Sequence, residues 1–334
     1  MRAVVLVGGF GTRLRPLTYS IPKPMLPVGH VAIIERLIAN LVRGGVDDVT
    51  LALGFKPEPF MEAFPDGTCA GATLHYAVEP EPLDTAGAIR FAAEFRGIDD
   101  TFVVANGDVL TDLDIAELVA FHRDRGAEAT LHLIGVEDPS SFGVVALDER
   151  GRVERFVEKP PAGTAPSNLI NAGTYVLEPS VVQRVEPGTK VSIERVTFPA
   201  MVADGRVYGM ATDDYWIDTG RPDLYRQANL DVVGGGRAHD RCEPVHASSA
   251  VDPTATVINS IVAAGASIGP GAIVRDSVLL DGAIIGRGAE VVESVVLGLV
   301  HDGAHVVDSV IGADGAVTAG ERIAGVRHPD PDAS

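Results

Sequence analysis

The chain has 334 residues, and 27 Lys and Arg against 46 Asp and Glu give it a formal net charge of -19 at pH 7. This acidity argues against general nucleic-acid binding, and no apolar run reaches the length that would span a membrane. Two cysteines, Cys69 and Cys242, give neither a disulfide framework nor a metal-binding spacing, so a cytoplasmic enzyme of two or three domains is expected.

The first predicted element is an apolar strand over residues 2–7 that runs into a glycine-rich loop. The first 34 residues carry four basic side chains and no acidic one. Glycines let the backbone approach a bulky ligand, and successive N–H groups in such a turn can bind an anion. Arg13 can bind two phosphate oxygens at once and Lys23 adds a compact charge, so a polyphosphate ligand is expected. The loop glycines are Gly8, Gly9 and Gly11.

The loop fits neither of two common phosphate-binding motifs. No Gly-Lys-Ser/Thr follows at the spacing of a Walker A loop, and Leu14 occupies the place of the third glycine of a dinucleotide fingerprint. Pro16, Pro22 and Pro24 also prevent a helix from starting directly after the loop. The loop with its prolines is therefore a motif of its own.

Beyond the loop, strand and helix patterns alternate along the chain up to residue 232. Helical spacing of apolar residues predicts helices over 34–42 and 85–95. This alternation predicts a mostly parallel sheet with ligands at the carboxyl ends of its strands. The glycine loop and Asn106-Gly107-Asp108 both follow strands, so they are expected to meet at one crevice. The later strands of this set are predicted over 49–53, 74–78 and 102–105.

Two aspartates are candidates for a metal site. Asp108 follows a buried strand, and Asp218 lies in Tyr-Trp-Ile-Asp-Thr-Gly. Each alone fits an ordinary turn or helix-cap residue. In a chain with a polyphosphate loop, the two together predict a Mg²⁺ site, because Mg²⁺ prefers one or two carboxylates plus water and substrate phosphates.

The sequence changes character after residue 232. A Gly-rich linker is expected over 233–250, a repeat region over 251–325 and a tail over 326–334. The serines of four similar triplets, beginning at Asn259-Ser260-Ile261, recur at spacings of 17, 17 and 15 residues. Such a pattern predicts a solenoid of about four coils. Aliphatic residues recur at six-residue steps: Val262, Ile268, Val274, Ile285, Val291, Val300, Val306, Ile311, Val317 and Ile323.

The string Gly-Gly-Phe-Gly-Thr-Arg-Leu-Arg-Pro-Leu-Thr with the later Pro-Lys-Pro resembles the signature of sugar-1-phosphate nucleotidyltransferases, closest to mannose-1-phosphate guanylyltransferases. The six-residue repeat resembles a left-handed parallel β-helix. The resemblance implies an α/β fold. A Rossmann-like mixed, mostly parallel sheet would form a nucleotidyltransferase domain over 1–232, and a short left-handed β-helix would follow over 251–325.

The resemblance also implies roles for individual residues. Arg13 would neutralise the leaving phosphates, Lys23 would bridge the α-phosphate and the sugar phosphate, and Asp108 and Asp218 would hold Mg²⁺. The implied nucleotide-binding residues are Gly8, Gly9, Gly11, Thr12, Arg13, Glu79, Thr85, Gly87 and Asn106. The implied sugar-phosphate-binding residues are Gly143, Glu158, Lys159 and Asn171.

Glu79 bears on the choice of base. An ionised carboxylate accepts and does not donate, which matches the adjacent N1–H and N2–H₂ donors of guanine and would repel the carbonyl oxygens of thymine or uracil. Thymidylyltransferases of similar layout tend to have Gln at this place. Asp84 departs from the family pattern, because it replaces a glycine close to the base site. It can adopt a left-handed backbone and cap the helix at Thr85, yet it adds a charge and leaves the nucleotide open.

The expected reaction is GTP plus mannose 1-phosphate giving GDP-mannose plus pyrophosphate. A glucose-1-phosphate thymidylyltransferase, or a transferase for another sugar 1-phosphate, is the alternative within the class. A non-catalytic regulatory subunit is another, although Arg13, Lys23, Asp108, Lys159 and Asp218 are all intact. Acyl transfer by the solenoid is a third, but His301 and His305 read as exposed turn residues. Expected partners are a nucleoside triphosphate, a sugar 1-phosphate and further copies of the chain through the β-helix, with neither nucleic acid nor membrane.

Overall fold

The computed structural model describes residues 1–9, 11–54, 57–237 and 242–331. Parts of the predicted linker (238–241) and tail (332–334) lie outside the described residues. The chain divides into two compact units, which are described separately. The first unit comprises Met1–Gly9 and Ile34–Trp216, and the second comprises Phe10–Ile33 and Ile217–Ser334.

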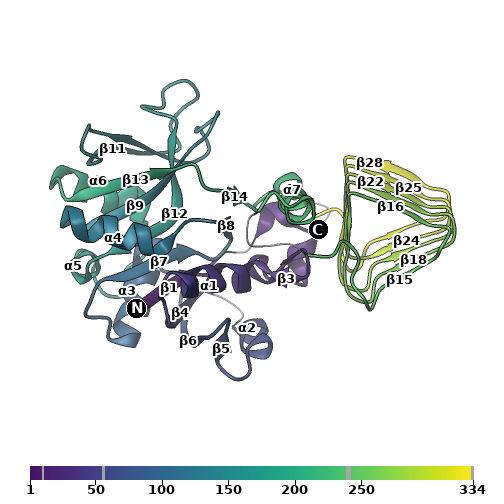
Figure 1. Ribbon diagram of the computed structural model, residues 1–334, viewed down its shortest axis with the longest axis horizontal. Helices are drawn as coiled ribbons and strands as arrows, with labels where there is room; N and C mark the ends of the chain where they lie inside the picture. The colour runs from purple at the N-terminus through teal and green to yellow at the C-terminus, as the bar shows by residue number, and fades with distance from the viewer. Residues whose placement is uncertain (10, 55–56, 238–241, 332–334) are drawn as a thin grey trace. The chain divides into compact units, whose positions relative to one another are not determined.

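The first unit is built on one large mixed sheet (Figure 1). Its centre is parallel, with β1 (Arg2–Leu6) between β4 (Asp48–Leu53) and β7 (Phe102–Asn106). On the β4 side the sheet continues with β6 (Ala72–Val78), which is parallel to β4, and ends with β5 (Thr68–Cys69), which is antiparallel to β6. Beyond β7 the sheet continues through β12 (Leu169–Leu177), β10 (Gly143–Leu147) and β11 (Val153–Glu158), all antiparallel pairs. A branch leaves β12 through the antiparallel β9 (Ala129–Gly135), and β13 (Val207–Thr212) pairs parallel with β9. The predicted strands 2–7, 49–53, 74–78 and 102–105 correspond to β1, β4, β6 and β7.

Helices cover this sheet, and their ends follow local chemistry. The Asp114 carboxylate accepts the N–H groups of Ala116 and Glu117 at the start of α4, which ends at Gly126 in a left-handed conformation (φ 55°). Tyr175 and Phe198 pack edge to face in the core, with ring centroids 5.1 Å apart. The helices are α1 (Ile33–Arg43), α2 (Glu58–Ala63), α3 (Asp84–Arg96), α4 (Ile115–Arg125), α5 (Pro179–Gln183), the π-helical turn η4 (Ile193–Thr197) and α6 (Phe198–Ala203). Two further short strands are β8 (Val109–Thr111), in the first unit, and β14 (Trp216–Asp218), whose last two residues belong to the second unit.

The second unit begins with the proline-rich segment after the glycine loop. Its elements are three short 3₁₀ turns, two short strands and one helix: η1 (Thr12–Leu14), η2 (Leu17–Tyr19), η3 (Lys23–Met25), β2 (Pro27–Val28), β3 (Val31–Ala32) and α7 (Pro222–Gly234). Within this unit α7 packs against β2, and the Asn229 side chain accepts the Gly29 N–H at 2.8 Å. Among the described residues the segment after Gly11 forms 3₁₀ turns and does not start an α-helix, as its prolines predict.

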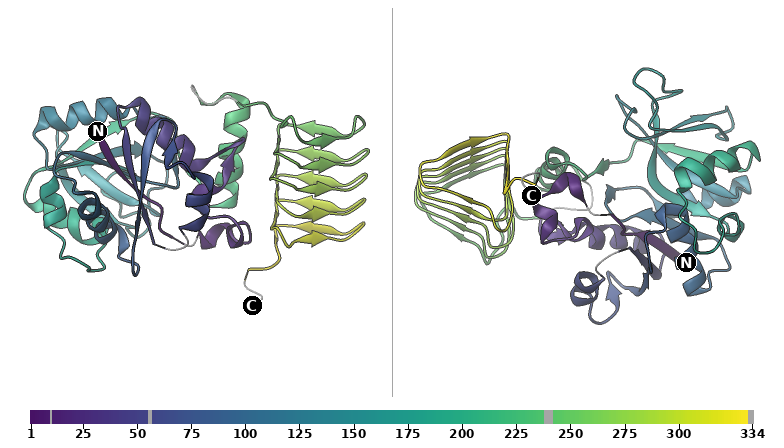
Figure 2. Two further views of the ribbon diagram at one scale, coloured as in Figure 1. Left: turned by 90° about the horizontal axis from the view of Figure 1, so that it is seen from below. Right: turned by 180° about the vertical axis from the view of Figure 1, so that it is seen from behind.

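The rest of the unit is a parallel β-helix made of three five-stranded sheets (Figure 2). It therefore has five coils, one more than the repeat pattern predicts, because the last coil has Gly325-Val326-Arg327 in place of a serine triplet. The first sheet contains β15 (Ala250–Val251), β18 (Ser267–Ile268), β21 (Ile284–Ile285), β24 (Leu299–Val300) and β27 (Ala316–Val317). The second contains β16 (Thr256–Ile258), β19 (Ile273–Arg275), β22 (Glu290–Val292), β25 (His305–Val307) and β28 (Arg322–Ala324). The third contains β17 (Ile261–Val262), β20 (Val278–Leu279), β23 (Val295–Val296), β26 (Val310–Ile311) and β29 (Arg327–His328).

The serine triplets form a ladder at one corner of the β-helix. The N–H of Ser277 donates to Ser260 Oγ at 3.0 Å, the N–H of Ser294 to Ser277 Oγ at 3.1 Å, and the N–H of Ser309 to Ser294 Oγ at 3.1 Å. The residue before each serine has a positive φ between 42° and 50°. The triplet spacing thus records a turn that repeats once per coil, and the predicted fold class is confirmed.

Two findings bear on the acyl-transfer alternative and on membrane-spanning helices. His301 is exposed as expected, whereas His305 lies half-buried in β25 with its Nδ1 3.1 Å from Glu290 Oε2, because the strand pairs Glu290 with His305 in register. No helix within the described ranges has the length and apolar character needed to cross a membrane.

Candidate functional site

Three predicted site residues converge within the second unit. Lys23 Nζ lies 3.1 Å from Asp218 Oδ1, and Arg13 Nη2 lies 3.9 Å from Asp218 Oδ2. The Gly220 N–H also donates to Asp218 Oδ1, at 2.9 Å. The Lys23 side chain is only 7% exposed, whereas that of Arg13 is 65% exposed. We call Arg13 and Lys23 the cationic clamp, in which Lys23 is fixed by the protein and Arg13 is open to a ligand.

Glycines make room for this clamp. A Cβ added at Gly220 would lie 2.7 Å from Arg13 Nη2 and 2.9 Å from Asp218 Oδ1, so a side chain there would force the Arg13 guanidinium or the Asp218 carboxylate to shift. Gly11 precedes η1 with φ 56°, and a Cβ there would lie 2.9 Å from Thr18 Cγ2. Thr12, the first residue of η1, is exposed. A compact turn therefore presents Thr12 and Arg13 side by side.

Further predicted residues lie in the first unit, and several of them are at the carboxyl ends of its parallel strands. Gly8 and Gly9 follow β1 and both are exposed, and apart from their chain neighbours no described residue has an atom within 4 Å of a Cβ built on either. The Gly107 N–H donates to the Leu6 carbonyl at 2.8 Å, so the turn after β7 lies against the end of β1. Within this unit the predicted meeting of the glycine loop and the Asn106–Asp108 turn is observed. Asp108 is half-buried there.

Glu79 lies just beyond β6 and is 8% exposed. Its Oε2 accepts the Leu83 N–H at 2.9 Å, and a Cβ on Gly54 would lie 3.9 Å from both Glu79 Oε2 and Gly8 Cα. Burial raises the pKa of the Glu79 carboxyl above its usual value, and the Leu83 hydrogen bond opposes that shift. Because each carboxylate oxygen can accept two hydrogen bonds, Glu79 keeps acceptor capacity while Leu83 fixes its orientation.

The start of α3 explains why aspartate replaces the family's glycine at position 84. Asp84 has φ 59°, and its Oδ1 accepts the Thr85 N–H at 2.8 Å. The left-handed backbone that the sequence allows is observed, whereas Asp84 is not the N-cap: α3 begins at Asp84 itself, and its N-cap is Leu83, which makes no side-chain capping hydrogen bond. A Cβ on Gly87 would lie 2.4 Å from the Thr189 carbonyl oxygen, so this position excludes any side chain.

Thr85 is bound to a residue that sequence reasoning missed. Its Oγ1 donates to Glu194 Oε2 at 2.7 Å and accepts the Ile193 N–H at 2.8 Å. Ser192 Oγ also donates to Glu194 Oε2, at 2.7 Å. Glu194 lies in the π-helical turn η4, a type of turn frequent at functional sites. In the sequence Ser192-Ile-Glu looks like an ordinary helix start, and nothing local signals the contact with Thr85.

The predicted sugar-phosphate residues form a second cluster in the first unit. Gly143 pairs in register with Glu158, and a Cβ on Gly143 would lie 2.9 Å from Glu158 Oε2. Lys159 Nζ lies 3.7 Å from Glu158 Oε1 and is largely exposed. Burial raises the pKa of the Glu158 carboxyl, Lys159 lowers it, and Glu194 raises it further. The cluster therefore combines a half-buried acceptor with an exposed cation.

Asn171 joins this cluster to the turn after β7. Its Nδ2 donates to the buried Tyr175 Oη at 2.8 Å, and its Oδ1 accepts the Gly173 N–H at 3.1 Å. A Cβ on Gly173 would lie 2.6 Å from Asn106 Nδ2, so Asn106 packs directly on this irregular part of β12. Tyr175 is a second residue that the sequence did not indicate, because it reads as part of an apolar strand.

The predicted metal ligands lie in different units, Asp108 in the first and Asp218 in the second, so their pairing stays a prediction. Among the described residues no group of three or more His, Cys, Asp or Glu could hold a metal. Two aspartates and no nitrogen or sulfur ligand make a donor set that fits Mg²⁺, which takes its remaining ligands from water and substrate phosphates.

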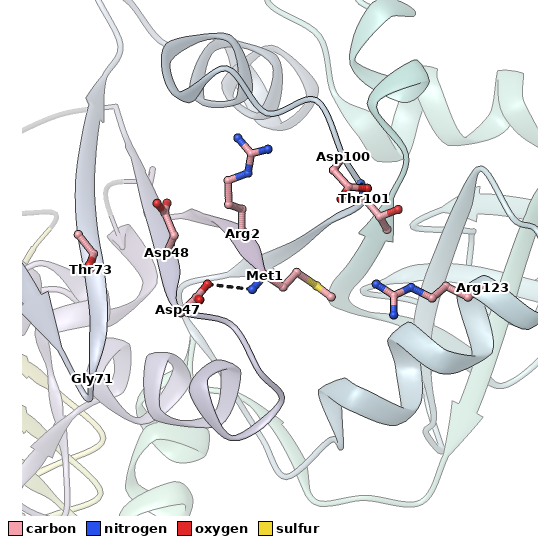
Figure 3. Close-up of a pocket in the computed structure, with 9 residues that line it drawn as sticks. All are labelled: Met1, Arg2, Asp47, Asp48, Gly71, Thr73, Asp100, Thr101 and Arg123. Carbon is pink, nitrogen blue, oxygen red and sulfur yellow. Dashed lines mark hydrogen bonds and ion pairs between the residues drawn. The ribbon is translucent and has the colours of Figure 1, made fainter.

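A polar pocket of about 820 Å³ lies elsewhere in the first unit (Figure 3). It adjoins the amino ends of β1, β4 and β7, opposite the strand ends that carry Gly8 and Asn106. The Met1 α-amino group donates to Asp47 Oδ1 at 2.8 Å at its wall. None of the predicted site residues lines this pocket. Its lining residues are Met1, Arg2, Asp47, Asp48, Gly71, Thr73, Asp100, Thr101 and Arg123.

Comparison with known proteins agrees with this arrangement. Residues 2–234 match the family described as Nucleotidyl transferase, and residues 245–332 match GlmU-like, C-terminal hexapeptide. Over 274 residues the chain is 42% identical to the mannose-1-phosphate guanylyltransferase of Mycobacterium tuberculosis, covering 79% of this chain and 75% of that one.

Two further relatives extend the comparison. A mannose-1-phosphate guanyltransferase of Schizosaccharomyces pombe is 39% identical, with 77% of this chain and 73% of that one covered. The crystal structure of HddC from Yersinia pseudotuberculosis superposes with a TM-score of 0.59 at 30% identity, covering 68% of this chain and 97% of HddC. The chain therefore belongs to the nucleotidyl transferase family, as a nucleotidyltransferase with a hexapeptide-repeat C-terminal region.

Proposed function

We propose that this enzyme transfers the guanylyl group of GTP to mannose 1-phosphate, giving GDP-mannose and pyrophosphate. The main observation that supports nucleotidyl transfer is the cationic clamp beside Asp218, in which Lys23 is nearly buried and Arg13 is exposed to solvent. The names of the two relatives support GTP and mannose 1-phosphate as substrates.

In the proposed mechanism the clamp neutralises charge. A phosphate oxygen of the sugar phosphate attacks the α-phosphorus of the nucleotide, the bond from the α-phosphorus to the bridging oxygen breaks, and pyrophosphate leaves. A phosphate dianion is already a nucleophile, so positioning and charge neutralisation supply most of the rate. The exposed Arg13 is suited to the leaving phosphates. Lys23, held by Asp218, is suited to the α-phosphate and the incoming phosphate.

The first unit supplies recognition in this proposal. Glu79 would accept the two donors of guanine, with Leu83 holding its carboxylate in place. Glu158 would accept a sugar hydroxyl, and Lys159 would bind the sugar phosphate. Asn171, oriented by Tyr175, would add an amide contact, and Gly143 would let the sugar ring approach the backbone.

We also propose that Asp108 and Asp218 hold Mg²⁺, which when bound offsets the charge of the two phosphate groups. The substrates place the enzyme in the cytoplasm in this proposal. Exposed aliphatic side chains on one β-helix sheet, Ile258 at 49%, Ile273 at 39% and Val307 at 39%, support a homo-oligomer through this region. Analytical ultracentrifugation tests the oligomer, with a monomer at micromolar concentration as the contrary result.

Pyrophosphate release by the purified protein tests the reaction. Each of GTP, dTTP, UTP and CTP would be combined with mannose 1-phosphate and with glucose 1-phosphate, with Mg²⁺ or with EDTA. We expect the highest kcat/KM with GTP and mannose 1-phosphate, and loss of turnover in EDTA that Mg²⁺ restores. Preference for another pair would replace the substrates in this proposal, and no release with any pair would remove the catalytic role.

A further inference from the structure

One glycine of the β-helix contacts the segment that carries the cationic clamp. A Cβ built on Gly312 would lie 2.8 Å from both Cβ and Cγ of Pro16, and both residues belong to the second unit. Gly312 is buried, and its backbone does not adopt a positive φ. Space for Pro16, and not backbone conformation, therefore requires glycine at this position.

Gly312 differs from the residues at the equivalent position in the other coils. Gly312 directly follows β26, and its N–H donates to the His328 carbonyl of the next coil at 2.8 Å. The residues that make the same hydrogen bond in the earlier coils are Ala263, Leu280 and Leu297. Of these four equivalent positions, the one that meets Pro16 is the only glycine. The coil surface is thus hollowed at one place.

A short series of contacts connects Pro16 to Arg13 and Lys23. Pro16 precedes the turn η2, whose Thr18 Oγ1 donates to the Gly11 carbonyl at 2.9 Å. A Cβ on Gly11 would lie 2.9 Å from Thr18 Cγ2 and 3.3 Å from Lys23 Cβ. The turn η2 therefore packs against the residue that starts η1, which carries Arg13, and close to the stem of Lys23. A displaced Pro16 would move both cations.

The segment is also held on either side of Pro16. Leu14 and Leu17 are fully buried, and Tyr19 Oη donates to the Pro331 carbonyl beyond the β-helix at 3.2 Å. The Arg15 guanidinium lies 5.1 Å from the Tyr19 ring centroid. With its neighbours held, the segment has little freedom to absorb a collision at Pro16.

We propose that the β-helix positions the cationic clamp for nucleotidyl transfer, and that Gly312 is the positioning residue. The inference rests on the proposed function, because it assumes that Arg13 and Lys23 act on phosphates. It gives the C-terminal region a role in the chemistry of a site to which it contributes no reacting group. A misplacement of about 1 Å in such a site costs on the order of a hundredfold in rate.

The test compares Gly312→Ala with Ala316→Val in the full chain. Ala316 is exposed at the start of β27, so the control adds bulk to the same region away from Pro16. We expect Gly312→Ala to lower kcat on the order of tenfold to a hundredfold. The KM for sugar 1-phosphate should change less than kcat, because Glu158 and Lys159, its other proposed contacts, belong to the other unit. We expect Ala316→Val to resemble the wild type.

A second background separates positioning from general damage. Pro16→Gly removes the two atoms that the new methyl group at position 312 would meet, so Gly312→Ala should cause no further loss of kcat, or of thermal stability, in that background. The double variant also serves if Gly312→Ala alone does not fold. Equal losses in both backgrounds, or a wild-type kcat in Gly312→Ala, would overturn the inference.

Calorimetric binding of inorganic pyrophosphate distinguishes this inference from the proposed function. If the wild type turns over no substrate pair yet binds pyrophosphate more tightly than Gly312→Ala, the proposed reaction fails and the positioning role stands. If the wild type is active and both proteins bind pyrophosphate equally and turn over equally, the positioning role fails alone.

Discussion

Lys23 and Asp218 form an ion pair with 3.1 Å between Nζ and Oδ1, although 195 residues separate them in the chain. The lysine side chain is 7% exposed and the aspartate 23%. A nearly buried lysine against the Asp218 carboxylate keeps its ammonium group in one place. Such fixed charge is more effective at a transition state than a mobile surface cation.

Lys23→Met should therefore abolish most turnover while keeping the apolar stem. We expect kcat to fall by about 10²–10³, the usual cost of a lost electrostatic contact in a transition state. Steady-state pyrophosphate release measures the effect. Lys190→Met is the matched control, because Lys190 is exposed and should retain wild-type kcat. A Lys23→Met enzyme within a few-fold of the wild type would remove Lys23 from the clamp.

Arg13→Ala should separate catalysis from stability. Its side chain is 65% exposed and lies 3.9 Å from Asp218, so thermal unfolding should occur at the wild-type temperature. The kcat should still fall by about 10²–10³, because Arg13 meets the leaving phosphates in the proposed mechanism. Arg150→Ala, another exposed arginine, should leave both quantities unchanged. Turnover that survives in Arg13→Ala would contradict this role.

Glu79→Gln should change nucleotide preference more than overall activity. Glutamine keeps an acceptor for the Leu83 N–H but presents one donor and one acceptor, which suits thymine or uracil better than guanine. A matched bidentate pair is worth roughly 1–3 kcal/mol, so the ratio of kcat/KM for GTP to that for dTTP should fall about 5- to 150-fold. Competition assays measure this ratio. Glu81→Gln, two residues away and exposed, should leave it unchanged, and an unchanged ratio in Glu79→Gln would exclude base reading by Glu79.

The same carboxylate predicts a pH dependence. Burial raises the pKa of Glu79 in the folded protein, so as pH falls it loses its charge earlier than an exposed glutamate. The preference for GTP over dTTP should decline through that raised pKa, and the Glu79→Gln enzyme should lack this decline. The free energy of unfolding depends on pH in the opposite direction from the GTP preference. The stabilising contribution of the protonated carboxyl is complete below its unfolded-state pKa and is lost as pH rises through the folded-state pKa. Profiles of kcat/KM from pH 4 to 8 check the first statement, and a pH-independent preference would contradict it.

The sequence predicts the parts of this enzyme that depend on local pattern. Alternating strands and helices give β1, β4, β6, β7 and α3, and the serine triplets give the corner ladder of the β-helix. Asp84 could be predicted to adopt a left-handed backbone because few residues other than glycine tolerate one.

Contacts between segments far apart in the chain cannot be predicted from such local patterns. Nothing local in the proline-rich segment shows that residues 10–33 join residues 217–334 in one compact unit. Glu194 meets Thr85 across 109 residues, and Tyr175 reads as one more apolar strand residue until its hydroxyl is seen to accept from Asn171. Gly312 resembles an ordinary corner glycine until Pro16 is placed beside it.

The serine ladder gives a prediction that concerns stability alone. Ser277 is fully buried, its Oγ donates to the Arg275 carbonyl at 2.7 Å, and it accepts the Ser294 N–H at 3.1 Å. Ser277→Ala would leave a buried donor and acceptor without these partners, at a cost of about 1–3 kcal/mol in the free energy of unfolding. Urea denaturation followed by circular dichroism measures this cost. Ser267→Ala, at a half-buried serine of the same coil, should cost less. Below the unfolding transition the Ser277→Ala enzyme should keep wild-type kcat, because the coil it weakens is not the one that meets Pro16. Equal unfolding free energies for the two variants would show that the ladder is not a source of stability.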